Sequence, residues 1–394
     1  MYPPGFNLLL AACRLSYGLS VADEAEEIIR GGGIDWDDLS RRTSFHRIEP
    51  QLFSLLQRLP QGLVPTTVIE RLRDDVQSNL VGQMRYVAEF FRIEEWLRAA
   101  DITVVPFKGF WLGESAYGNI GARTSSDIDL FIDICDLEKV KSIMTEKGYA
   151  RHDGVDRLTD AYVRKELAEY NFDRYEDGNC QAHVEFHWRS TMSFYRMDIT
   201  LDDLRSQMTT GVLQGREITV FSPAANLLLV VMHHGGKECF IQLRQVLDIA
   251  HILRSSPDLD TGWLLRQAGR FHVTTLLFMG VRLAHELTGV EVPAPLTAKI
   301  NDRQNGRPVG SVNGHRTDRL ASGRVRLMAK PVDELIDYKE RLVSWLFKIQ
   351  SRDGCAVKAN LTYYTLRKII APRLAPDKWR HHFFNRKIRR SKVD

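Results

Sequence analysis

The sequence has few of the features that mark secreted, membrane-spanning and zinc-ribbon proteins. Its 394 residues include only five cysteines, with no Cys-x-x-Cys pair. A scattered, odd-numbered set disfavours a disulfide framework or a zinc ribbon and is typical of the reducing cytosol. The longest clear apolar run, Leu227 to Met232, is far shorter than the roughly 20 residues that span a bilayer. The N-terminal apolar patch follows no basic region, which disfavours a signal peptide. We therefore expect a cytoplasmic protein with no membrane segment.

The chain also lacks a strong charge bias. A formal net charge of +4 is slight for this length and does not by itself predict a nucleic-acid-binding protein. The apolar fraction of 44% and the charged fraction of 26% are those of an ordinary soluble protein. The length predicts two or three domains with a substantial core.

Changes in the residue pattern along the chain predict an α+β fold, with a small mixed sheet between N-terminal and C-terminal helical regions. Asp35 and Ser222-Pro223 are typical helix starts, and Gly148 is a typical helix end. Asp177-Gly178 predicts a hairpin between strands at 167–175 and 180–188. The predicted units are a helical region at 1–100, an α/β core at 101–222, a helical domain closing a cleft at 223–300, a flexible linker at 301–330, and helices with a basic tail at 331–394.

An alternation of acidic and apolar residues at 127–132 (DIDLFI) is the most informative stretch. It is typical of a half-buried strand, in which Asp127 and Asp129 share one face. Two carboxylates at this spacing can bind a hard cation such as Mg²⁺ together with substrate phosphates. The alternative is a solvated strand face, although aspartate is depleted in strands.

A second polar alternation occupies residues 180–188 (CQAHVEFHW). On a strand, His183, Glu185 and His187 point to one face. If Glu185 faces the same cleft as Asp127 and Asp129, three carboxylates could bind two Mg²⁺ ions, which align a triphosphate and activate an attacking hydroxyl. The alternative is that Glu185 pairs with a neighbouring histidine or arginine on a solvated face.

Taken together, these motifs resemble the uncharacterised bacterial nucleotidyltransferase family of the DNA polymerase β superfamily. The resemblance covers residues 30–290 and implies that Asp127, Asp129 and Glu185 are the three catalytic metal ligands. Lys108-Gly109 lies where the superfamily usually has Gly-Ser or Gly-Gly, and the gap from Gly109 to Asp127 is longer than usual. The motifs that carry the resemblance are Lys108-Gly109, Asp127-Ile128-Asp129-Leu130, Val184-Glu185-Phe186-His187-Trp188, His233-His234-Gly235, Lys237 and Leu247-Asp248-Ile249.

Several further residues are expected to bind the nucleotide. Gly109 at a strand-to-helix turn would let backbone N–H groups reach a phosphate. Lys108 and Arg123 would add positive charge, unless they are a solvated lysine and a surface-loop arginine. His234 and Lys237 lie three residues apart on one helix face, where Asp248 could orient one of them. The full set is Lys108, Gly109, Arg123, Ser126, His187, His234, Lys237 and Asp248.

The function expected from these residues is transfer of a nucleoside monophosphate from a nucleoside triphosphate to a hydroxyl or phosphate acceptor, with release of pyrophosphate. Mg²⁺ or Mn²⁺ would be the cofactor, and Asp129 or Glu185 could also act as base. The acceptor is left open between a small molecule, a peptide, a protein and a tRNA.

Two other functions compete with this one. His183, Glu185 and His187, with His233 or His234, could hold iron or zinc, as in two-His-one-carboxylate enzymes, but this leaves both aspartates unexplained. Alternatively, the chain is a non-catalytic nucleotide- or RNA-binding module that uses its basic end, Arg380 to Lys392. Binding would then depend on salt and be lost on deleting residues 380–394.

Overall fold

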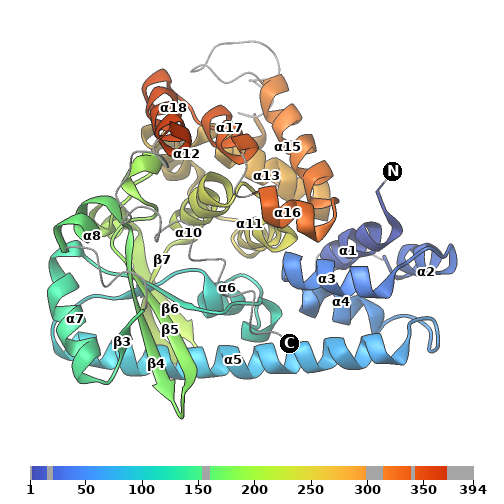
Figure 1. The fold of residues 1–394 in the computed structure, drawn as a ribbon, viewed down its shortest axis with the longest axis horizontal. Helices are drawn as coiled ribbons and strands as arrows, with labels where there is room; N and C mark the ends of the chain where they lie inside the picture. The colour runs from blue at the N-terminus through green and yellow to red at the C-terminus, as the bar shows by residue number, and fades with distance from the viewer. Residues whose placement is uncertain (1, 16–20, 153–159, 299–313, 339–341, 371–394) are drawn as a thin grey trace.

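Helices surround a small mixed sheet in the computed structural model, which describes residues 2–15, 21–152, 160–298, 314–338 and 342–370 (Figure 1). The α+β class predicted from the sequence is confirmed. The N-terminal helices are α1 (Pro4–Leu15), α2 (Ala22–Arg30), α3 (Trp36–His46), α4 (Glu49–Leu56) and α5 (Thr66–Ala99). The sheet region contains β1 (Val105–Pro106), α6 (Gly109–Ser115), β2 (Ile128–Phe131), α7 (Leu137–Glu146), β3 (Ala150–Arg151), α8 (Asp160–Glu166), β4 (Glu169–Glu176), β5 (Asn179–His187), α9 (Leu201–Leu204), β6 (Met208–Leu213) and β7 (Arg216–Phe221). The C-terminal helices are α10 (Pro223–Val231), α11 (Leu243–Ser255), α12 (Thr261–Arg270), α13 (Thr274–Thr288), α15 (Gly314–Met328), α16 (Val332–Tyr338), α17 (Leu342–Gln350) and α18 (Cys355–Ile370).

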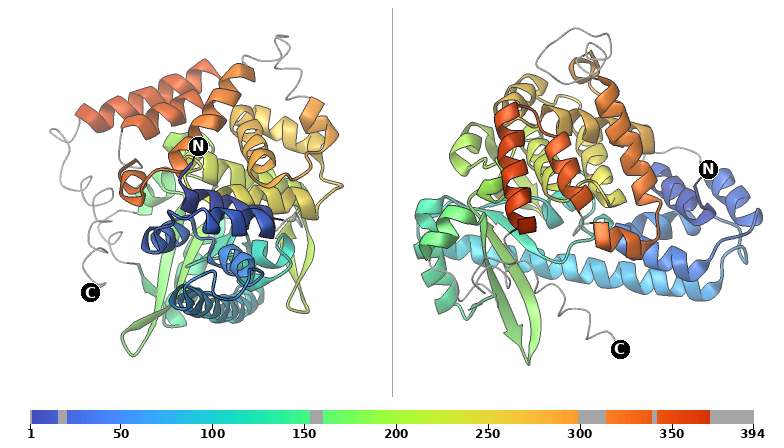
Figure 2. Two further views of the ribbon diagram at one scale, coloured as in Figure 1. Left: turned by 90° about the vertical axis from the view of Figure 1, so that its right-hand side faces the viewer. Right: turned by 45° about the horizontal axis from the view of Figure 1, so that its top comes forward.

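The long helix α5 connects the N-terminal helices to the sheet. It spans 34 residues and runs beneath both regions, as Figure 1 and the end-on view of Figure 2 show. Its first half packs against α4. Val87, Phe90, Ile93 and Leu97 in its second half join the core on one face of the sheet. The same helix therefore supports two regions of the chain.

The five-stranded sheet has the order β1-β2-β5-β4-β3, and only the β2–β5 pair is parallel among the pairs described. The predicted β4–β5 hairpin is present. Asp177 and Gly178 have φ values of 48° and 78°, the left-handed pair that a two-residue hairpin turn requires. The predicted strand at 102–107 is reduced to Val105–Pro106. Strand β6 was not predicted because its run Thr209-Thr210-Gly211 breaks the apolar alternation of a half-buried strand.

The two faces of the sheet differ sharply in polarity. Ile128, Leu130, Val184 and Phe186 are fully buried in a core shared with α5 and α7. This matches the period-two alternation predicted for β2 and β5 and leaves their polar residues on the other face. Helices α10–α13 and the N-terminal helices α1–α4 belong to a second hydrophobic core.

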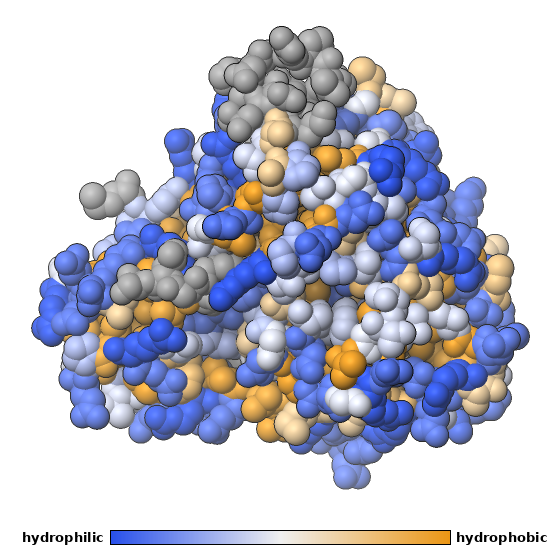
Figure 3. Space-filling model, turned by 180° about the vertical axis from the view of Figure 1, so that it is seen from behind, coloured by the Kyte–Doolittle hydropathy of each residue, from blue (hydrophilic) through white to orange (hydrophobic). Residues whose placement is uncertain are grey.

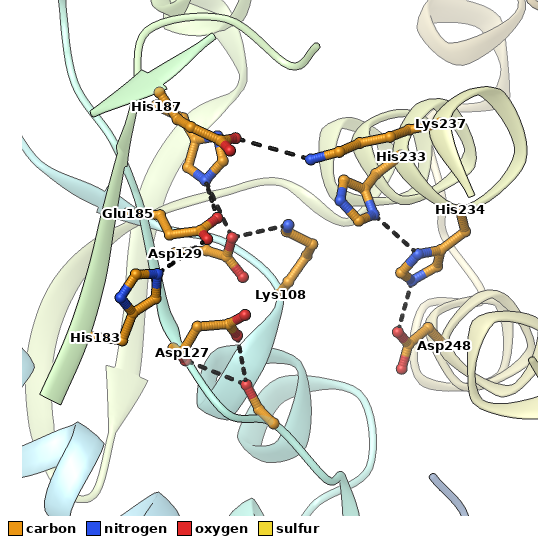
Figure 4. A network of polar contacts seen from close by, with 12 residues as sticks. Lys108, Asp127, Asp129, His183, Glu185, His187, His233, His234, Lys237 and Asp248 are labelled. Atoms are coloured by element: carbon orange, nitrogen blue, oxygen red, sulfur yellow. Dashed lines mark hydrogen bonds and ion pairs between the residues drawn. The ribbon is translucent and has the colours of Figure 1, made fainter. Parts of the chain in front are cut away.

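The predicted helix starts are confirmed in their details. The Asp35 side chain accepts hydrogen bonds from the first turn of α3, and the Ser222 hydroxyl accepts one from Ala225 ahead of α10. Helix α10 is apolar except for Asn226 and is buried from Ala224 to Val231. It places the following six residues, the π-helix Met232–Lys237, beside the polar face of the sheet (Figure 4).

Part of the predicted linker is helical. Helix α15 covers Gly314–Met328, where Ala321, Val325 and Met328 are buried. Their spacing of four and three residues is helical, but the surrounding charged residues concealed it. The prediction of a linker is therefore wrong for these residues, whereas 301–313 and the basic end at 380–392 lie outside the described residues. Within the predicted helix at 334–350, the structure describes α16 up to Tyr338 and α17 from Leu342, and residues 339–341 lie outside the described ranges.

Within the described ranges, even the longest helix is too polar to be a membrane span. The face opposite to that of Figure 1 is mainly hydrophilic, with apolar residues in small separate patches (Figure 3).

Candidate active site

The three predicted acidic residues lie on one face of the sheet. Asp129 on β2 is the direct register partner of Glu185 on the parallel strand β5, and Asp127 is two residues before Asp129. Because paired residues of neighbouring strands point to the same face, the three carboxylates converge (Figure 4). The solvated-face interpretation is wrong for Asp129, which is 5% exposed.

The loop that carries Asp127 is held by the N-terminal helices. Gln83 of α5 donates to the carbonyl oxygen of Ser125 at 3.0 Å, and Gln51 of α4 donates to that of Ala122 at 2.7 Å. The Ser125 hydroxyl in turn donates to Asp127 Oδ1 at 3.1 Å. The N-terminal helices therefore position one of the acids.

Lys108 is buried in the site rather than solvated. Its Nζ lies 2.8 Å from Asp129 Oδ1 and 4.6 Å from the centre of the Phe107 ring. The backbone reaches this position through a strained turn, with φ of 61° at Lys108 and 43° at Gly109. A Cβ at Gly109 would lie 3.4 Å from Ser125 Oγ. Positive φ at a non-glycine residue is costly and is concentrated at functional sites.

His187 bridges two of the carboxylates. Its Nε2 is 3.1 Å from Asp129 Oδ1 and 3.4 Å from Glu185 Oε2, while its Nδ1 is 3.3 Å from Glu169 Oε2. Burial alone would lower the pKa of His187, but these acids outweigh it and raise the pKa to about 9. The imidazolium therefore balances part of the negative charge.

The three carboxylates have different electrostatic environments. Burial, followed by repulsion from Asp129 and Glu185, raises the pKa of Asp127 above its ordinary value. Burial also acts to raise the pKa of Asp129, but Lys108 and His187 outweigh it and the pKa is lowered. Hydrogen bonds from His183 and His187 likewise outweigh burial and hold the pKa of Glu185 well below its usual range. Asp127 is thus the acid whose charge is least compensated.

Two acids on β4 complete the polar face, and the sequence analysis missed both. Glu169 faces His187, and its Oε2 is 3.9 Å from the Nζ of Lys237. Asp173 lies between two histidines: its Oδ1 is 2.5 Å from His183 Nδ1, and its Oδ2 is 2.5 Å from His152 Nδ1. The period-two spacing of Glu169, Asn171 and Asp173 on a predicted strand was the signal that could have found them.

A second buried cluster lies on the helical side, centred on Asp248. Arg123 binds its carboxylate through two contacts of 2.8 Å, and Tyr117 and His234 donate to it at the same distance. Asp248 and Arg123 are 0% and 2% exposed. Although burial opposes it, the Arg123 charge and the His234 hydrogen bond lower the pKa of Asp248 well below its usual value.

The predicted residues thus fall into two groups. Lys108, Asp127, Asp129, Glu185, His187 and Lys237 surround the polar face of the sheet (Figure 4). Arg123, His234 and Asp248 bind one another instead. Gly109 forms the strained turn, and Ser126 is exposed beside Asp127. Arg123 is not a surface-loop residue, since it is buried and its guanidinium binds Asp248 through Nε and Nη2.

The donor atoms of the sheet face suit a divalent cation. Asp129, Glu185 and His187 each offer a ligand atom within 4.8 Å of the others, and Asp127 precedes them on the same face. Carboxylate oxygens are the ligands that Mg²⁺ and Mn²⁺ prefer. His152, Asp173 and His183 form a second such group, with the nitrogen-rich donors that suit zinc or iron.

Comparison with known proteins identifies the family. Residues 32–289, more than half of the chain, match the model of a family described as "Uncharacterised nucleotidyltransferase". The chain therefore belongs to this family, and the enzyme class predicted from its motifs, a nucleotidyltransferase, is confirmed.

Other similarities are more distant. No curated protein matches the chain. A crystal structure of an antigenic nucleotidyltransferase-like protein from Paracoccidioides brasiliensis is 13% identical, covers 55% of this chain and 95% of its own, and has a TM-score of 0.32.

Proposed function

We propose that this nucleotidyltransferase is Mg²⁺- or Mn²⁺-dependent and moves a nucleoside monophosphate from a nucleoside triphosphate to an acceptor, as in the DNA polymerase β superfamily. The observation that carries the proposal is the register pairing of Asp129 with Glu185, which sets both carboxylates beside Asp127 on one face, where Asp129 is buried and the other two are half-buried. Lys108, Lys237 and His187 compensate some of the five carboxylates on this face, but Asp127 is left with repulsion from its acidic neighbours. A divalent ion with a triphosphate is the ligand that this face suits.

In this proposal Asp127, Asp129 and Glu185 hold the metal. A bound Mg²⁺ would neutralise phosphate charge and align the reacting atoms. Ser125 orients Asp127, while His187 orients Asp129 and Glu185 through its shared Nε2. The chain's own part in catalysis is therefore to hold the oxygen ligands in a fixed arrangement, which is the main requirement in phosphoryl transfer.

The cationic side chains would bind the triphosphate. Lys108 and Lys237 approach the carboxylates from opposite elements, the turn before α6 and the π-helix (Figure 4). Ser126 and Gly109 lie beside Asp127 and would offer polar contacts from the loop. The cluster of Asp248 with Arg123 and His234 would have an indirect role, because it fixes the helix that carries Lys237.

The test is label transfer from each α-labelled nucleoside triphosphate in the presence of Mg²⁺ and a cell extract. Wild type is expected to give a labelled product, and Asp129→Ala is expected to lose it. Lys141→Met, which changes a lysine on α7 that pairs with Glu138, is the control. Label transfer that survives Asp127→Ala and Asp129→Ala would contradict the proposal.

The transition-metal alternative has one observation in its favour, the group His152, Asp173 and His183. Elemental analysis of purified protein separates the two functions, because Mg²⁺ washes off whereas zinc or iron held by imidazoles stays bound. Stoichiometric iron or zinc that is lost in His152→Ala would favour the alternative.

A further inference from the structure

The π-helix Met232–Lys237 presents two consecutive histidines in an unusual backbone. Gly235 and Gly236 make this possible, because a Cβ at Gly236 would lie 2.2 Å from Met197 Cε and one at Gly235 would lie 2.5 Å from Phe240. The helix is thus pressed against its neighbours at two points. Single π-turns of this kind occur frequently at functional sites.

His234 and His233 form a chain of contacts that starts at Asp248. His234 Nε2 is 2.8 Å from Asp248 Oδ2, and His234 Nδ1 is 3.2 Å from His233 Nδ1. His234 is 1% exposed, whereas His233 is half-buried. Figure 4 shows His233 extending with Lys237 from the helix toward the sheet carboxylates.

The chain of contacts determines where the protons lie. The Asp248 carboxylate only accepts, so His234 Nε2 must carry a hydrogen. His234 is buried near Arg123 and Arg244, and burial lowers its pKa to about 4, so the ring is neutral and its Nδ1 has a lone pair. His233 Nδ1 must then donate to that lone pair. In a neutral His233 the remaining nitrogen, Nε2, is left as an acceptor.

The surroundings of His233 keep it neutral. Lys108, Lys237 and His187 lie around it, and burial together with these positive charges lowers the pKa of His233 well below its ordinary value. A neutral imidazole with a lone pair facing the reaction space is a proton acceptor. Asp129 and Glu185 are less available as bases, because their oxygens already contact Lys108, His183 and His187 and would hold the metal.

We propose that His233 Nε2 accepts the proton of the attacking group, and that the acceptor substrate is therefore an alcohol rather than a phosphate. The inference rests on the proposed nucleotidyl transfer. The acceptor oxygen forms a bond to the α-phosphorus, the bond from that phosphorus to the bridging oxygen breaks, and pyrophosphate leaves with the electron pair. The hydroxyl proton goes to His233 and then to solvent. A phosphate acceptor is already anionic at neutral pH and needs no such base.

Two probe acceptors test the assignment. α-Labelled ATP with Mg²⁺ is incubated with either glycerol, an alcohol, or inorganic phosphate, which would give ADP. His233→Ala is expected to lower transfer to glycerol by about 10²–10⁴-fold, the usual contribution of a general base, and to change transfer to phosphate by less than about threefold. Added imidazole is expected to restore the glycerol reaction. His285→Ala, at an exposed histidine of α13, is the control.

Three results would overturn the proposal. Transfer to both acceptors could fall equally, as for a residue that only binds the nucleotide or supports the fold. His233→Ala could leave transfer to both acceptors unchanged. Imidazole could fail to restore the alcohol reaction. A loss of both reactions in Asp129→Ala but not in His233→Ala would leave the proposed function intact while removing the role of His233.

The tautomer can be measured without turnover. Nitrogen-15 NMR of the wild type at pH 7 should show His233 neutral with its hydrogen on Nδ1, and His234 with its hydrogen on Nε2. Asp248→Asn should disturb both assignments. A doubly protonated His233, or one with its hydrogen on Nε2, would refute the inference even in a protein that proved inactive with every nucleotide.

Discussion

Two clusters of charged residues lie on opposite sides of the site, one on the helices and one on the sheet. They differ in how far the negative charge of their carboxylates is compensated. On the helical side, Asp248 is satisfied by Arg123, Tyr117 and His234 at 2.8 Å each. On the sheet side, several carboxylates share Lys108 and His187. The Asp248 carboxylate is thus fully paired, and Arg244 adds further positive charge 3.8 Å from it, whereas the sheet cluster leaves Asp127 with its charge poorly compensated.

The comparison separates structural from functional charge. A buried ion pair whose hydrogen bonds are all made is costly to break, because the remaining partner is left without compensation. An uncompensated buried carboxylate is instead a site at which the protein gives up stability for a ligand. The following predictions test this difference, from the largest expected effect to the smallest.

Asp248→Ala is expected to have the largest effect on stability. It leaves the Arg123 guanidinium buried without its carboxylate, which should lower the free energy of unfolding by about 3–5 kcal/mol. Denaturant unfolding measures the change. Asp202→Ala, which breaks the exposed pair with Arg205, is the control and should cost less than about 1 kcal/mol. Equal losses in the two variants would remove the distinction between the clusters.

Asp127→Asn is expected to lower the transfer activity strongly without lowering the stability. Transfer should fall by more than about 100-fold, because changes behind a metal ligand already cost about 10–100-fold. Stability should not fall, because burial and repulsion already disfavour the charged form in the folded state. Label transfer and unfolding are measured on the same preparation. A variant that is active, or that is destabilised as much as Asp248→Ala, would contradict the comparison.

The helical cluster should be sensitive to acid. His251, which stacks on Tyr117 with 3.7 Å between ring centres, has a pKa that burial lowers to about 4. The unfolded chain therefore binds more protons below about pH 6.5, and stability is lost as the pH falls from 6.5 to 4. At pH 5 this one group should cost about 2 kcal/mol, at about 1.4 kcal/mol per pKa unit.

His251→Phe retains a ring on Tyr117 but cannot titrate. Between pH 7 and 4, unfolding of this variant should take up about one proton less than unfolding of the wild type. An unaltered pH dependence in His251→Phe would place the acid sensitivity elsewhere.

Lys108→Met should have the smallest effect of these variants, a change in the affinity for Mn²⁺. The Lys108 ammonium is 2.8 Å from Asp129 Oδ1, so it competes with a metal for that oxygen. Its removal should tighten Mn²⁺ binding by about threefold to tenfold, or about 1 kcal/mol, as measured by electron paramagnetic resonance. Lys141→Met should leave the affinity unchanged. Weaker Mn²⁺ binding in Lys108→Met would show that Lys108 supports the metal ligands rather than competing with them.

Much of the sheet could be predicted because short stretches of sequence determine its strands and turn. The alternation at 127–132 and 180–188 separated the polar from the apolar face, since side chains on a strand have a fixed period of two. The hairpin turn at Asp177-Gly178 and the helix caps at Asp35 and Ser222 follow from single residues with strong conformational preferences. The helix at Gly314–Met328 escaped prediction because charged and polar residues lie between its buried apolar ones.

The sequence by itself determined which residues carry charge and which face of each strand they occupy. Only the tertiary structure decided their partners. A bulge between Arg174 and Tyr175 shifts the β4–β5 register by one residue, so that Glu185 lies opposite Asn171. Counting back from the turn without the bulge would set it opposite Tyr170. Likewise Arg123 and Asp248, 125 residues apart, meet only because the sheet and the helices pack together, since the energy of a buried ion pair depends on distance and burial that no local pattern encodes.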